Sequence, residues 1–356
     1  MPTGHADLPR LRDQAGRALD AFTGRQRQEL GGISPDLAPC LDAITGLLAG
    51  GKRLRPAFCY WGWRAAGGED EPGIHAAAAA LELLHASALV HDDLMDASDT
   101  RRGQLSVHRR FAARHAAGGW RGPGDAFGAG TAILIGDLLL AWTGQMFHGS
   151  GLPPEALRRG QPVLDAMGTD VICGQYLDLL GQNRGDDTVA SALRVVRYKS
   201  ASYTVERPLQ LGAALAGAAD GPLAAASTAY GIPLGVAFQL RDDVLGVFGD
   251  PGVTGKPAGD DLREGKRTAL VALARERATA AERERLGRGL GDPALDEAGT
   301  AELRTIITGT GALAACERMI ESSVTEALRA LADAPMTAEA KLALTDLAVV
   351  VTDRNG

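Results

Sequence analysis

The 24-residue stretch HAAAAALELLHASALVHDDLMDAS, at positions 75–98, decides the fold class of this chain. Alanine and leucine fill most of it and β-branched residues are almost absent, so it predicts one long helix. Asp92 and Asp96 stand four residues apart in this stretch. A helix therefore places both carboxylates on one face, about 6 Å apart along its axis.

These two carboxylates predict a site for a divalent cation. Like charges at this spacing repel each other unless a cation lies between them. Hard oxygen ligands suit Mg²⁺, which keeps several waters and takes further ligands from substrate phosphates. The alternative is a solvated acidic helix end. The apolar residues 81–91 argue against that alternative, because they indicate that the carboxylates emerge from a buried helix.

The rest of the chain alternates long Ala- and Leu-rich stretches with short Gly- and Pro-rich breaks. No strand pattern of useful length and no fixed repeat occurs. Residues 112–130 and 249–265 are rich in glycine and are expected to be loops. Pro56 is expected to start a helix, since proline is tolerated in a first turn. The prediction is an all-α bundle of ten or more helices, the others covering residues 8–30, 36–49, 131–148, 154–182, 188–217, 222–248, 267–286, 297–330 and 336–353.

A second acidic cluster, Asp242-Asp243, lies on another long apolar stretch. Gln239 precedes Asp242 by three residues and shares its helix face. Gly246 stands at the position that would complete a second DDxxD motif. Alone, this cluster is equally compatible with a polar helix end. Facing the first cluster, it could hold several cations around one diphosphate. Further carboxylates follow at Asp250, Asp260 and Asp261.

Basic residues predict an anion site near the first cluster. The segment GKRLRP, residues 51–56, packs three cations between a glycine turn and a helix start, where backbone N–H groups favour phosphate. Arg101 and Arg102 follow Asp96 closely, and can pair with its neighbouring carboxylates or bind a diphosphate. Further candidate cations, each of which alone would be interpreted as a surface residue, are Lys199, Lys256, Lys266 and Arg267.

His85 lies seven residues before Asp92, two helical turns back on nearly the same face. The structural interpretation is a core histidine whose ring nitrogens are hydrogen-bonded within the protein. The functional interpretation is a substrate ligand aligned with Asp92, and both are kept.

Composition excludes several classes of function. The chain has 356 residues and a formal charge of −7, which disfavours general nucleic-acid binding. No apolar run reaches the ~18 residues that span a bilayer, and the N-terminus lacks a secretory apolar region. We therefore expect a cytoplasmic protein without a membrane span. The cysteines have no zinc-like spacing and are expected to be reduced core residues: Cys40, Cys59, Cys173 and Cys316.

Six motifs follow one another as GKRLRP (51–56), LVHDDLMD with DTRRG (89–103), GQYLDL (174–179), YKSA (198–201), FQLRDD (238–243) and GKPAGDDLREGKRT (255–268). In this order they resemble the trans-isoprenyl diphosphate synthase, or polyprenyl synthetase, family. The resemblance implies a single domain, residues 1–356, built as a bundle of long helices around a deep central cavity and assembled as a homodimer. It implies a prenyltransferase that joins isopentenyl diphosphate to dimethylallyl, geranyl or farnesyl diphosphate.

The resemblance also assigns roles residue by residue. Asp92 and Asp96, supported by Asp93, would bind Mg²⁺ at the allylic diphosphate, and Asp242 would bind a further ion, about three ions in all. The allylic diphosphate would also contact Arg101, Lys199 and Lys256.

Isopentenyl diphosphate would contact Lys52, Arg55, His85 and Arg102 by the same resemblance. Gln175 and Asp178 would line the site, Ser200 would contact substrate, and Gln239 would lie near the reacting carbons. The site would be closed by Lys266 and the C-terminal Arg354. Three features depart from the family: Gly246 replaces the last aspartate of the second motif, Ser200 replaces a threonine, and the segment 112–130 is longer than usual.

Product length in this family depends on the residues one turn before the first aspartate. Ser87 and Ala88 occupy those positions and are small, so nothing bulky stops a growing chain there. Leu84 or Leu81 would form the floor one turn or two turns deeper, and the alternative is a floor formed by the helices that face this one. The implied product is geranylgeranyl diphosphate (C20), with C25 or longer as the alternative.

Two other functions compete with this one. A class I terpene cyclase also uses DDxxD and Mg²⁺, but it ionises a single substrate, and the GKRLRP segment with Arg101 and Arg102 favours two diphosphates. A non-catalytic subunit of a heteromeric synthase would be expected to lose aspartates of the first motif, and all three are present here.

Overall fold

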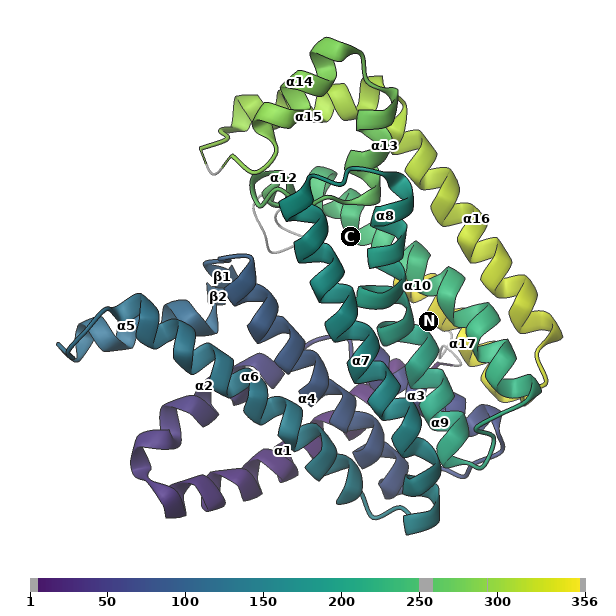
Figure 1. Cartoon of the computed structure of the whole chain (residues 1–356). Helices are drawn as coiled ribbons and strands as arrows, with labels where there is room; N and C mark the ends of the chain where they lie inside the picture. Colours follow the sequence, from purple (N-terminus) through teal and green to yellow (C-terminus); the bar gives the residue numbers. More distant parts are fainter. Residues whose placement is uncertain (1–5, 250–258, 293, 353–356) are drawn as a thin grey trace. The chain divides into compact units, whose positions relative to one another are not determined.

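The structure, a computed structural model, describes residues 6–249, 259–292 and 294–352. These residues form helices and one short antiparallel hairpin (Figure 1). The predicted all-α class is therefore confirmed. The elements up to residue 148 are α1 (Leu8–Ile33), the 3₁₀ turn η1 (Pro35–Leu37), α2 (Ala38–Leu48), α3 (Leu54–Ala65), α4 (Pro72–Met95), β1 (Thr100–Arg101), β2 (Gln104–Leu105), α5 (Val107–Ala117) and α6 (Gly124–His148).

The remaining elements are also helical. They are α7 (Pro154–Arg184), α8 (Val189–Val195), the π-helix η2 (Val196–Glu206), α9 (Arg207–Leu215), α10 (Pro222–Phe248), α12 (Asp260–Arg263), α13 (Ala269–Arg277), α14 (Ala280–Gly289), α15 (Glu297–Gly309), α16 (Ala312–Asp333) and α17 (Ala338–Thr352).

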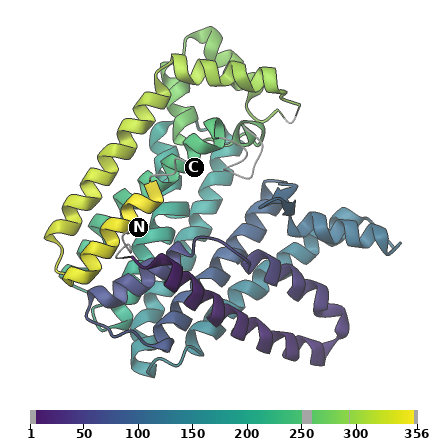
Figure 2. The same ribbon diagram turned by 180° about the vertical axis from the view of Figure 1, so that it is seen from behind.

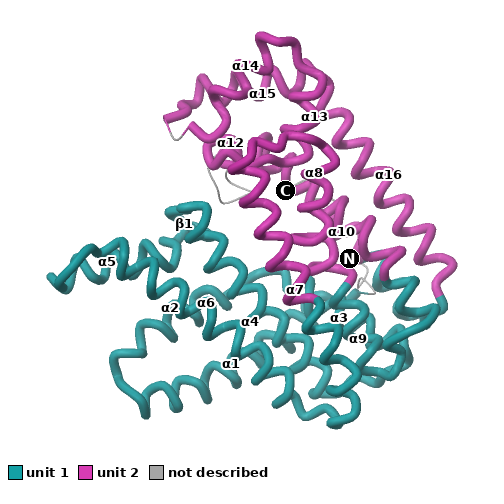
Figure 3. The backbone as a smooth tube through the Cα atoms, in the orientation of Figure 1, with its two compact units in different colours: residues 1–166, 207–227, 335–346 teal, residues 167–206, 228–334, 347–356 magenta. Residues whose placement is uncertain are grey.

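The chain divides into two compact units (Figure 3). Unit 1 comprises residues 1–166, 207–227 and 335–346, and unit 2 comprises residues 167–206, 228–334 and 347–356. Three of the five boundaries fall inside α7, α10 and α17, and the other two fall between η2 and α9 and between α16 and α17. The expectation of a single domain stays a prediction.

Helix α4 forms the centre of unit 1. It packs against α1, α2, α3, α5, α6 and α9, and it runs alongside α6 in both views (Figures 1 and 2). Residues 77–80 are alanines that are at most 2% exposed. A helix that is apolar on all sides is buried on all sides, and small side chains let its neighbours approach closely. The stretch that decides the fold thus becomes the core helix of its unit.

Unit 2 has its own core, in which α13 packs against α8, α14, α15 and α16. Residues 269–274 of α13 are all buried, and α10 contributes Leu240 and Val247, both fully buried. Burial of this apolar surface is the main term that stabilises the unit.

The expectation of a loop over residues 112–130 was wrong. Helix α5 continues to Ala117 and α6 begins at Gly124, so only a short connection remains. A Cβ atom on Gly128 would overlap the His108 carbonyl oxygen and lie 3.0 Å from the Ala112 nitrogen. Glycine here permits close packing of α5 on α6, and does not mark a turn.

Several element boundaries also differ from the sequence prediction. Helix α3 begins at Leu54 and not at Pro56, with Arg53 before it in the left-handed region at φ 52°. The stretch 188–217 contains the π-helix η2 between two α-helices. The predicted loop 249–265 ends in the short helix α12, and its residues 250–258 lie outside the described part of the chain.

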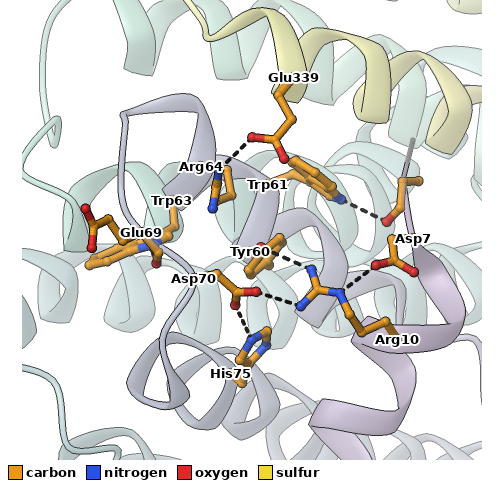
Figure 4. Close-up of polar contacts among 11 residues, drawn as sticks. Asp7, Arg10, Tyr60, Trp61, Trp63, Arg64, Glu69, Asp70, His75 and Glu339 are labelled. Atoms are coloured by element: carbon orange, nitrogen blue, oxygen red, sulfur yellow. Dashed lines mark hydrogen bonds and ion pairs between the residues drawn. The ribbon is translucent and has the colours of Figure 1, made fainter. Parts of the chain in front are cut away.

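A polar network attaches the start of α1 to the rest of unit 1 (Figure 4). The Arg10 guanidinium donates to Asp7 Oδ2 at 2.5 Å, to Asp70 Oδ2 at 2.8 Å and to the Tyr60 hydroxyl at 3.2 Å. Asp70 Oδ1 lies 2.6 Å from His75 Nε2, and the His75 ring stacks on Tyr60. The network therefore joins α1, α3 and the first turn of α4.

Three helices are long and apolar enough to cross a membrane, by length and composition only: α4, α6 and α10. The expectation that no apolar run reaches the length of a membrane span was wrong on this measure. Within α4, 78% of the most apolar window is buried inside the protein, so core packing accounts for its composition. The corresponding fractions are 44% for α6 and 50% for α10.

Candidate active site

The first acidic cluster lies at the C-terminal end of α4. Asp92 and Asp93 are in its last turn, and Asp96 caps it, with the Asp96 N–H donating to the Asp92 carbonyl at 2.8 Å. This bond keeps Asp92 and Asp96 one helical turn apart, as their spacing predicted. Both are partly exposed, whereas the Asp93 side chain is 1% exposed and faces the interior.

Arg101 holds Asp93 from the hairpin that follows α4. Its Nε donates to Asp93 Oδ1 at 2.9 Å, and its Nη2 contacts the same oxygen. Of the two roles that the sequence left open for Arg101, the structure shows the pairing with a carboxylate. Strand β1 pairs with β2, and the turn residues Arg102 and Gly103 have φ values of 52° and 74°. Two successive positive φ angles are typical of a type I′ hairpin turn.

The hairpin turn brings Arg102 to the GKRLRP segment. Its Nη1 donates to the carbonyls of Leu47 at 3.2 Å and Ala49 at 3.3 Å. A Cβ atom on Gly51 would lie 3.5 Å from Arg102 Nη2, so the guanidinium lies over the glycine turn. Two basic motifs that are about fifty residues apart in sequence are therefore neighbours.

Arg53 anchors the GKRLRP segment, a role that the sequence did not assign. Arg53 Nη1 lies 2.5 Å from Glu82 Oε2 on α4, and Nη2 contacts the Leu48 carbonyl. The two charged side chains are 7% and 5% exposed. Glu82 is the only acidic residue between His75 and His91. A single carboxylate in this apolar stretch was the signal in the sequence that a buried cation pairs with it. Lys52 is exposed and Arg55 is partly buried, so they are the cations of the segment that remain accessible.

Positive charge gathers around His85, which is partly buried on α4. Burial is the main cause that lowers the pKa of His85 well below its ordinary value, and nearby cations lower it further. Burial also lowers the pKa of Arg102, while the Glu82 carboxylate opposes that shift. The cations that act on His85 are, in decreasing order, Arg55, Arg102, Arg101 and Arg53.

The proposed chain-length residues differ in their surroundings. Ser87 is 4% exposed, and its hydroxyl donates to the Gly136 carbonyl of α6 at 2.8 Å. Leu84 and Leu81 are also buried, whereas Ala88 is only partly buried. Ser87 therefore belongs to the contact between α4 and α6.

The second acidic cluster lies on α10 in unit 2. Gln239 Nε2 donates to Asp243 Oδ1 at 2.9 Å, so the amide bonds the second aspartate, although it was expected to share a face with the first. Asp243 is 4% exposed. Burial raises the pKa of Asp243 to about 7, and the charges of Asp261 and Asp242 raise it too, while the Gln239 hydrogen bond and Lys266 oppose them.

Lys199 is held by Asp178 within unit 2. Lys199 Nζ lies 2.7 Å from Asp178 Oδ2, which joins η2 to α7. A Cβ atom on Gly174 would overlap the Lys199 nitrogen and lie 2.7 Å from its Cα, so glycine permits this approach. Ser200 is 7% exposed in the π-helix, a conformation that often occurs at functional sites. Gln175 Nε2 is buried and has no hydrogen-bond partner among the described residues.

Lys266 forms two ion pairs, with Asp261 Oδ1 at 3.1 Å and Glu264 Oε2 at 2.7 Å. These carboxylates raise the pKa of Lys266 above its ordinary value despite its burial. Lys256, Asp250 and Arg354, which the sequence also singled out, lie outside the described residues.

The predicted site residues are divided between the two units. The first DDxxD motif and the basic cluster belong to unit 1, whereas Gln175, Lys199, Gln239, Asp242 and Lys266 belong to unit 2. Their convergence on one cavity stays a prediction. Across the part of the chain that is described, no three His, Cys, Asp or Glu side chains are placed to hold a metal ion by themselves.

The model of the polyprenyl synthetase family matches residues 38–307. The chain belongs to the polyprenyl synthetase family. It is a prenyltransferase, and the resemblance inferred from its motifs is confirmed. The individual roles of its site residues stay predictions.

Solved and curated relatives agree with this family. The polyprenyl synthetase is 39% identical to a geranylgeranyl pyrophosphate synthase of Corynebacterium glutamicum, solved with isoprenyl diphosphate and magnesium, at a TM-score of 0.94 covering 98% of this chain and 100% of that one. It is 32% identical over 338 residues to the geranylgeranyl diphosphate synthase of Mycobacterium tuberculosis, covering 93% of this chain and 89% of the relative. It is 38% identical over 234 residues to the geranylfarnesyl diphosphate synthase of Aeropyrum pernix, covering 65% of this chain and 68% of the relative.

Proposed function

We propose that this polyprenyl diphosphate synthase condenses isopentenyl diphosphate with allylic diphosphates and releases geranylgeranyl diphosphate as its main product. One observation carries the proposal: unit 1 holds two separate sets of groups for anions. The carboxylates of Asp92 and Asp96 can hold a diphosphate through a metal, and Arg55 and Arg102, whose charges act on His85, can hold a second one directly. A cyclase acts on one diphosphate and needs only the first set.

The residues present fit Mg²⁺. Asp92 and Asp96 offer hard carboxylate oxygens one helical turn apart, and Asp242 offers another on α10. Mg²⁺ is bound by one or two carboxylates together with waters and substrate phosphates, so a set of three protein ligands in one place is not required. The Asp243 carboxylate also has a buried Oδ2 without a hydrogen-bond partner among the described residues.

The two substrates are assigned to different cations. We assign isopentenyl diphosphate to Lys52, Arg55, His85 and Arg102, of which the last three are electrostatically coupled in unit 1. His85 is neutral at pH 7 because its pKa is lowered, so its ring N–H can donate a hydrogen bond without adding charge. The allylic diphosphate is assigned to Arg101, Lys199 and Lys256.

The proposed reaction is an electrophilic alkylation. Mg²⁺, when bound, offsets the negative charge that develops on the leaving diphosphate. Arg101 and Lys199 donate to that diphosphate, the allylic C1–O bond breaks, and its electron pair leaves on oxygen. The double bond of isopentenyl diphosphate then bonds to the allylic carbon. A proton is lost from the former isopentenyl unit to the departing diphosphate, which balances the step.

The C20 product rests on the small residues below Asp92. Ala88 is partly buried one turn before Asp92 and has no bulk to stop a chain. Leu84 lies one turn deeper, and we assign it to the floor that stops the growing prenyl chain. Relatives at 32–39% identity are named for C20 synthesis, and one at 38% is named for geranylfarnesyl diphosphate, which keeps C25 as the alternative.

The proposal includes a homodimer formed through α6. This helix exposes large apolar side chains at Ile133 (48%), Leu134 (69%) and Leu140 (39%). Exposed apolar side chains that lie near one another are typical of an interaction surface, and a second copy of the chain is the occupant we propose. Leu134→Glu should convert a dimer into a monomer in light scattering, whereas Leu342→Glu, at an exposed leucine of α17, should not. A monomeric wild-type protein would contradict this assignment.

The cytoplasm is the compartment that we propose. All four cysteines are free, as expected in a reducing environment. Cys59 and Cys316 are buried, whereas Cys173 is exposed and Cys40 is intermediate, so the expectation of four core cysteines was only partly met.

An assay of diphosphate release tests the proposed function. A condensing synthase releases diphosphate from an allylic substrate only when isopentenyl diphosphate is also present. A cyclase releases it from the allylic substrate alone, and a non-catalytic subunit releases none. Chromatography of the dephosphorylated products then reads the chain length. Main products of C15, or diphosphate release without isopentenyl diphosphate, would refute the proposal.

A further inference from the structure

The π-helix η2 is bonded to α7 at two points within unit 2. Lys199 Nζ lies 2.7 Å from Asp178 Oδ2, and the Ser202 hydroxyl donates to Asp170 Oδ2 at 2.8 Å. The two carboxylates are eight residues apart, and Gly174, which lets α7 approach the Lys199 backbone, lies midway between them. Because residues at i, i+4 and i+8 share one side of a helix, Asp170, Gly174 and Asp178 form a stripe of α7 that faces η2.

Glycines of α10 contact the opposite side of η2. A Cβ atom on Gly235 would overlap the Cα atom of Ala201, and one on Gly231 would lie 2.7 Å from the Cα atom of Glu206. A π turn closes with i→i+5 hydrogen bonds and holds about one residue more than an α turn, so its backbone is wider. The missing side chains on both neighbouring helices make room for that wider backbone. The π conformation is therefore part of the packing between α7 and α10.

The register of η2 decides where its two predicted site residues point. Each residue of an α-helix turns the chain by about 100° around the axis. If one π turn lost its extra residue, Lys199 and Ser200 would therefore rotate by about 100° relative to the later residues of η2. A rotation of this size would carry both side chains away from any ligand that they contact. Ser202 follows directly after these residues, so its bond to Asp170 holds the register where they lie.

Lys199 has two possible anionic partners under the proposed function, Asp178 and the allylic diphosphate. When Lys199 turns toward the diphosphate, it gives up one of the two bonds between η2 and α7. The other bond does not depend on that exchange. Ser202 is 1% exposed, so a substrate has no access to its hydroxyl. The Ser202–Asp170 bond therefore stays in place while Lys199 changes its partner.

We propose that Ser202 and Asp170 are positioning residues, which hold the π register of η2 and thereby aim Lys199 and Ser200 at the diphosphate of the allylic substrate. This inference rests on the proposed function and deepens it. Neither residue touches substrate, and neither acts on isopentenyl diphosphate. Loss of the bond should therefore weaken binding of the allylic substrate alone.

Isothermal titration calorimetry tests the proposal without turnover. The allylic probe is the thiolodiphosphate analogue of farnesyl diphosphate, whose carbon–sulfur bond resists ionisation, in the presence of Mg²⁺. The second probe is isopentenyl diphosphate. Ser202→Ala removes a single oxygen atom and should weaken binding of the analogue roughly 10-fold, the effect of one hydrogen bond to a charged group. Its affinity for isopentenyl diphosphate should not change.

Variants of Asp170 separate positioning from charge. Asp170→Ala should weaken binding of the analogue, although it removes a negative charge that repels a diphosphate. Asp170→Asn keeps an acceptor oxygen for Ser202, so it should bind the analogue as tightly as the wild type or more tightly. Ser202→Ala combined with Asp170→Ala should bind no more weakly than Asp170→Ala, because both changes remove one bond. Tighter binding in both single Asp170 variants would show an effect of charge alone and would overturn the proposal.

Thr228→Ala is the matched control at the other end of η2. The Thr228 hydroxyl donates to Glu206 Oε1 at 2.7 Å, and Glu206 is 7% exposed and seven residues from Lys199. Thr228→Ala should lower the melting temperature at least as much as Ser202→Ala, and should leave affinity for the analogue unchanged. An equal loss of affinity in both variants would indicate a structural role only. That result, or wild-type affinity in Ser202→Ala, would contradict the proposal.

Melting temperatures identify any variant that fails to fold. If Asp170→Ala does not fold, Ser202→Ala and the near-isosteric Asp170→Asn still decide the question. The condensation assay of the wild-type enzyme is independent of these variants, so failure of the proposed function is recognised separately.

Discussion

Glu82→Ala is predicted to destabilise the protein strongly, because it leaves a buried guanidinium without its counter-charge. Arg53 Nη1 lies 2.5 Å from Glu82 Oε2, and the two side chains are only 7% and 5% exposed. The Arg53 guanidinium also contacts the Leu48 carbonyl, and that contact too lies in the interior. Removal of the carboxylate therefore leaves a charge that has little access to water.

The expected loss follows from this burial. Breaking one side of a buried ion pair costs about 3–5 kcal/mol of the free energy of unfolding. At about 2.1 cal/mol/K per residue, 356 residues give an unfolding entropy of about 0.75 kcal/mol/K. The melting temperature should thus fall by about 4–7 °C. Because Arg53 stands between Lys52 and Arg55, the KM for isopentenyl diphosphate should rise as well.

Differential scanning calorimetry with two control variants tests this reasoning. Arg53→Met with Glu82→Met removes both charges and should recover much of the loss, since an apolar pair carries no desolvation penalty. Asp42→Ala breaks the exposed Arg27–Asp42 pair, whose side chains are 49% and 52% exposed, and should cost at most about 1 kcal/mol. The reasoning fails if Glu82→Ala melts no lower than Asp42→Ala, or if the double variant melts as low as Glu82→Ala.

Three further predictions concern the site. Asp92→Ala should leave the melting temperature unchanged or higher, because it relieves the repulsion between like charges. The steady-state rate with Mg²⁺ should fall by orders of magnitude, and near-normal turnover would exclude the metal role of Asp92. Ala88→Phe should shorten the product in chromatography, whereas Ser87→Phe should instead lower stability, because Ser87 is packed and hydrogen-bonded against α6. His85 has a lowered pKa when folded, so the unfolded chain binds its proton more tightly and stability should fall as the pH drops below about 6.5. His85→Gln should flatten that dependence in pH-dependent denaturant titrations, and an unchanged slope would contradict it.

The sequence predicted those features that depend on helical periodicity alone. The 3.6-residue repeat of a helix places Asp92 and Asp96 one turn apart. Asp96 is the residue that caps the helix, and the hydrogen bond from its N–H to the Asp92 carbonyl keeps this separation. The same reasoning identified α4 as a buried helix, because its apolar residues surround the axis. Neither inference needed knowledge of any distant part of the chain.

Features that depend on tertiary contacts could not be predicted in this way. Glycines at 124–130 suggested a loop, yet Gly128 serves the close approach of α5 and α6. Arg53 looked like one more phosphate ligand in GKRLRP, and only the position of Glu82 shows that it is committed to an ion pair. The hairpin 100–105 has two residues in each strand, too few for an alternating pattern to be recognised.

The second acidic motif shows how such contacts change the meaning of a motif. Taken as a string, FQLRDDVLG lacks an aspartate at position 246, and the lack suggests a weaker cation site. In the structure, the same space holds the Asp261 carboxylate, which a polar segment delivers from fifteen residues further along the chain. A methyl group at 246 would overlap that carboxylate, so alanine at this position requires the Asp261 side chain to move. The motif therefore describes the carboxylates of one helix only. The charge at the site also depends on the side chains of every other element that packs against that helix.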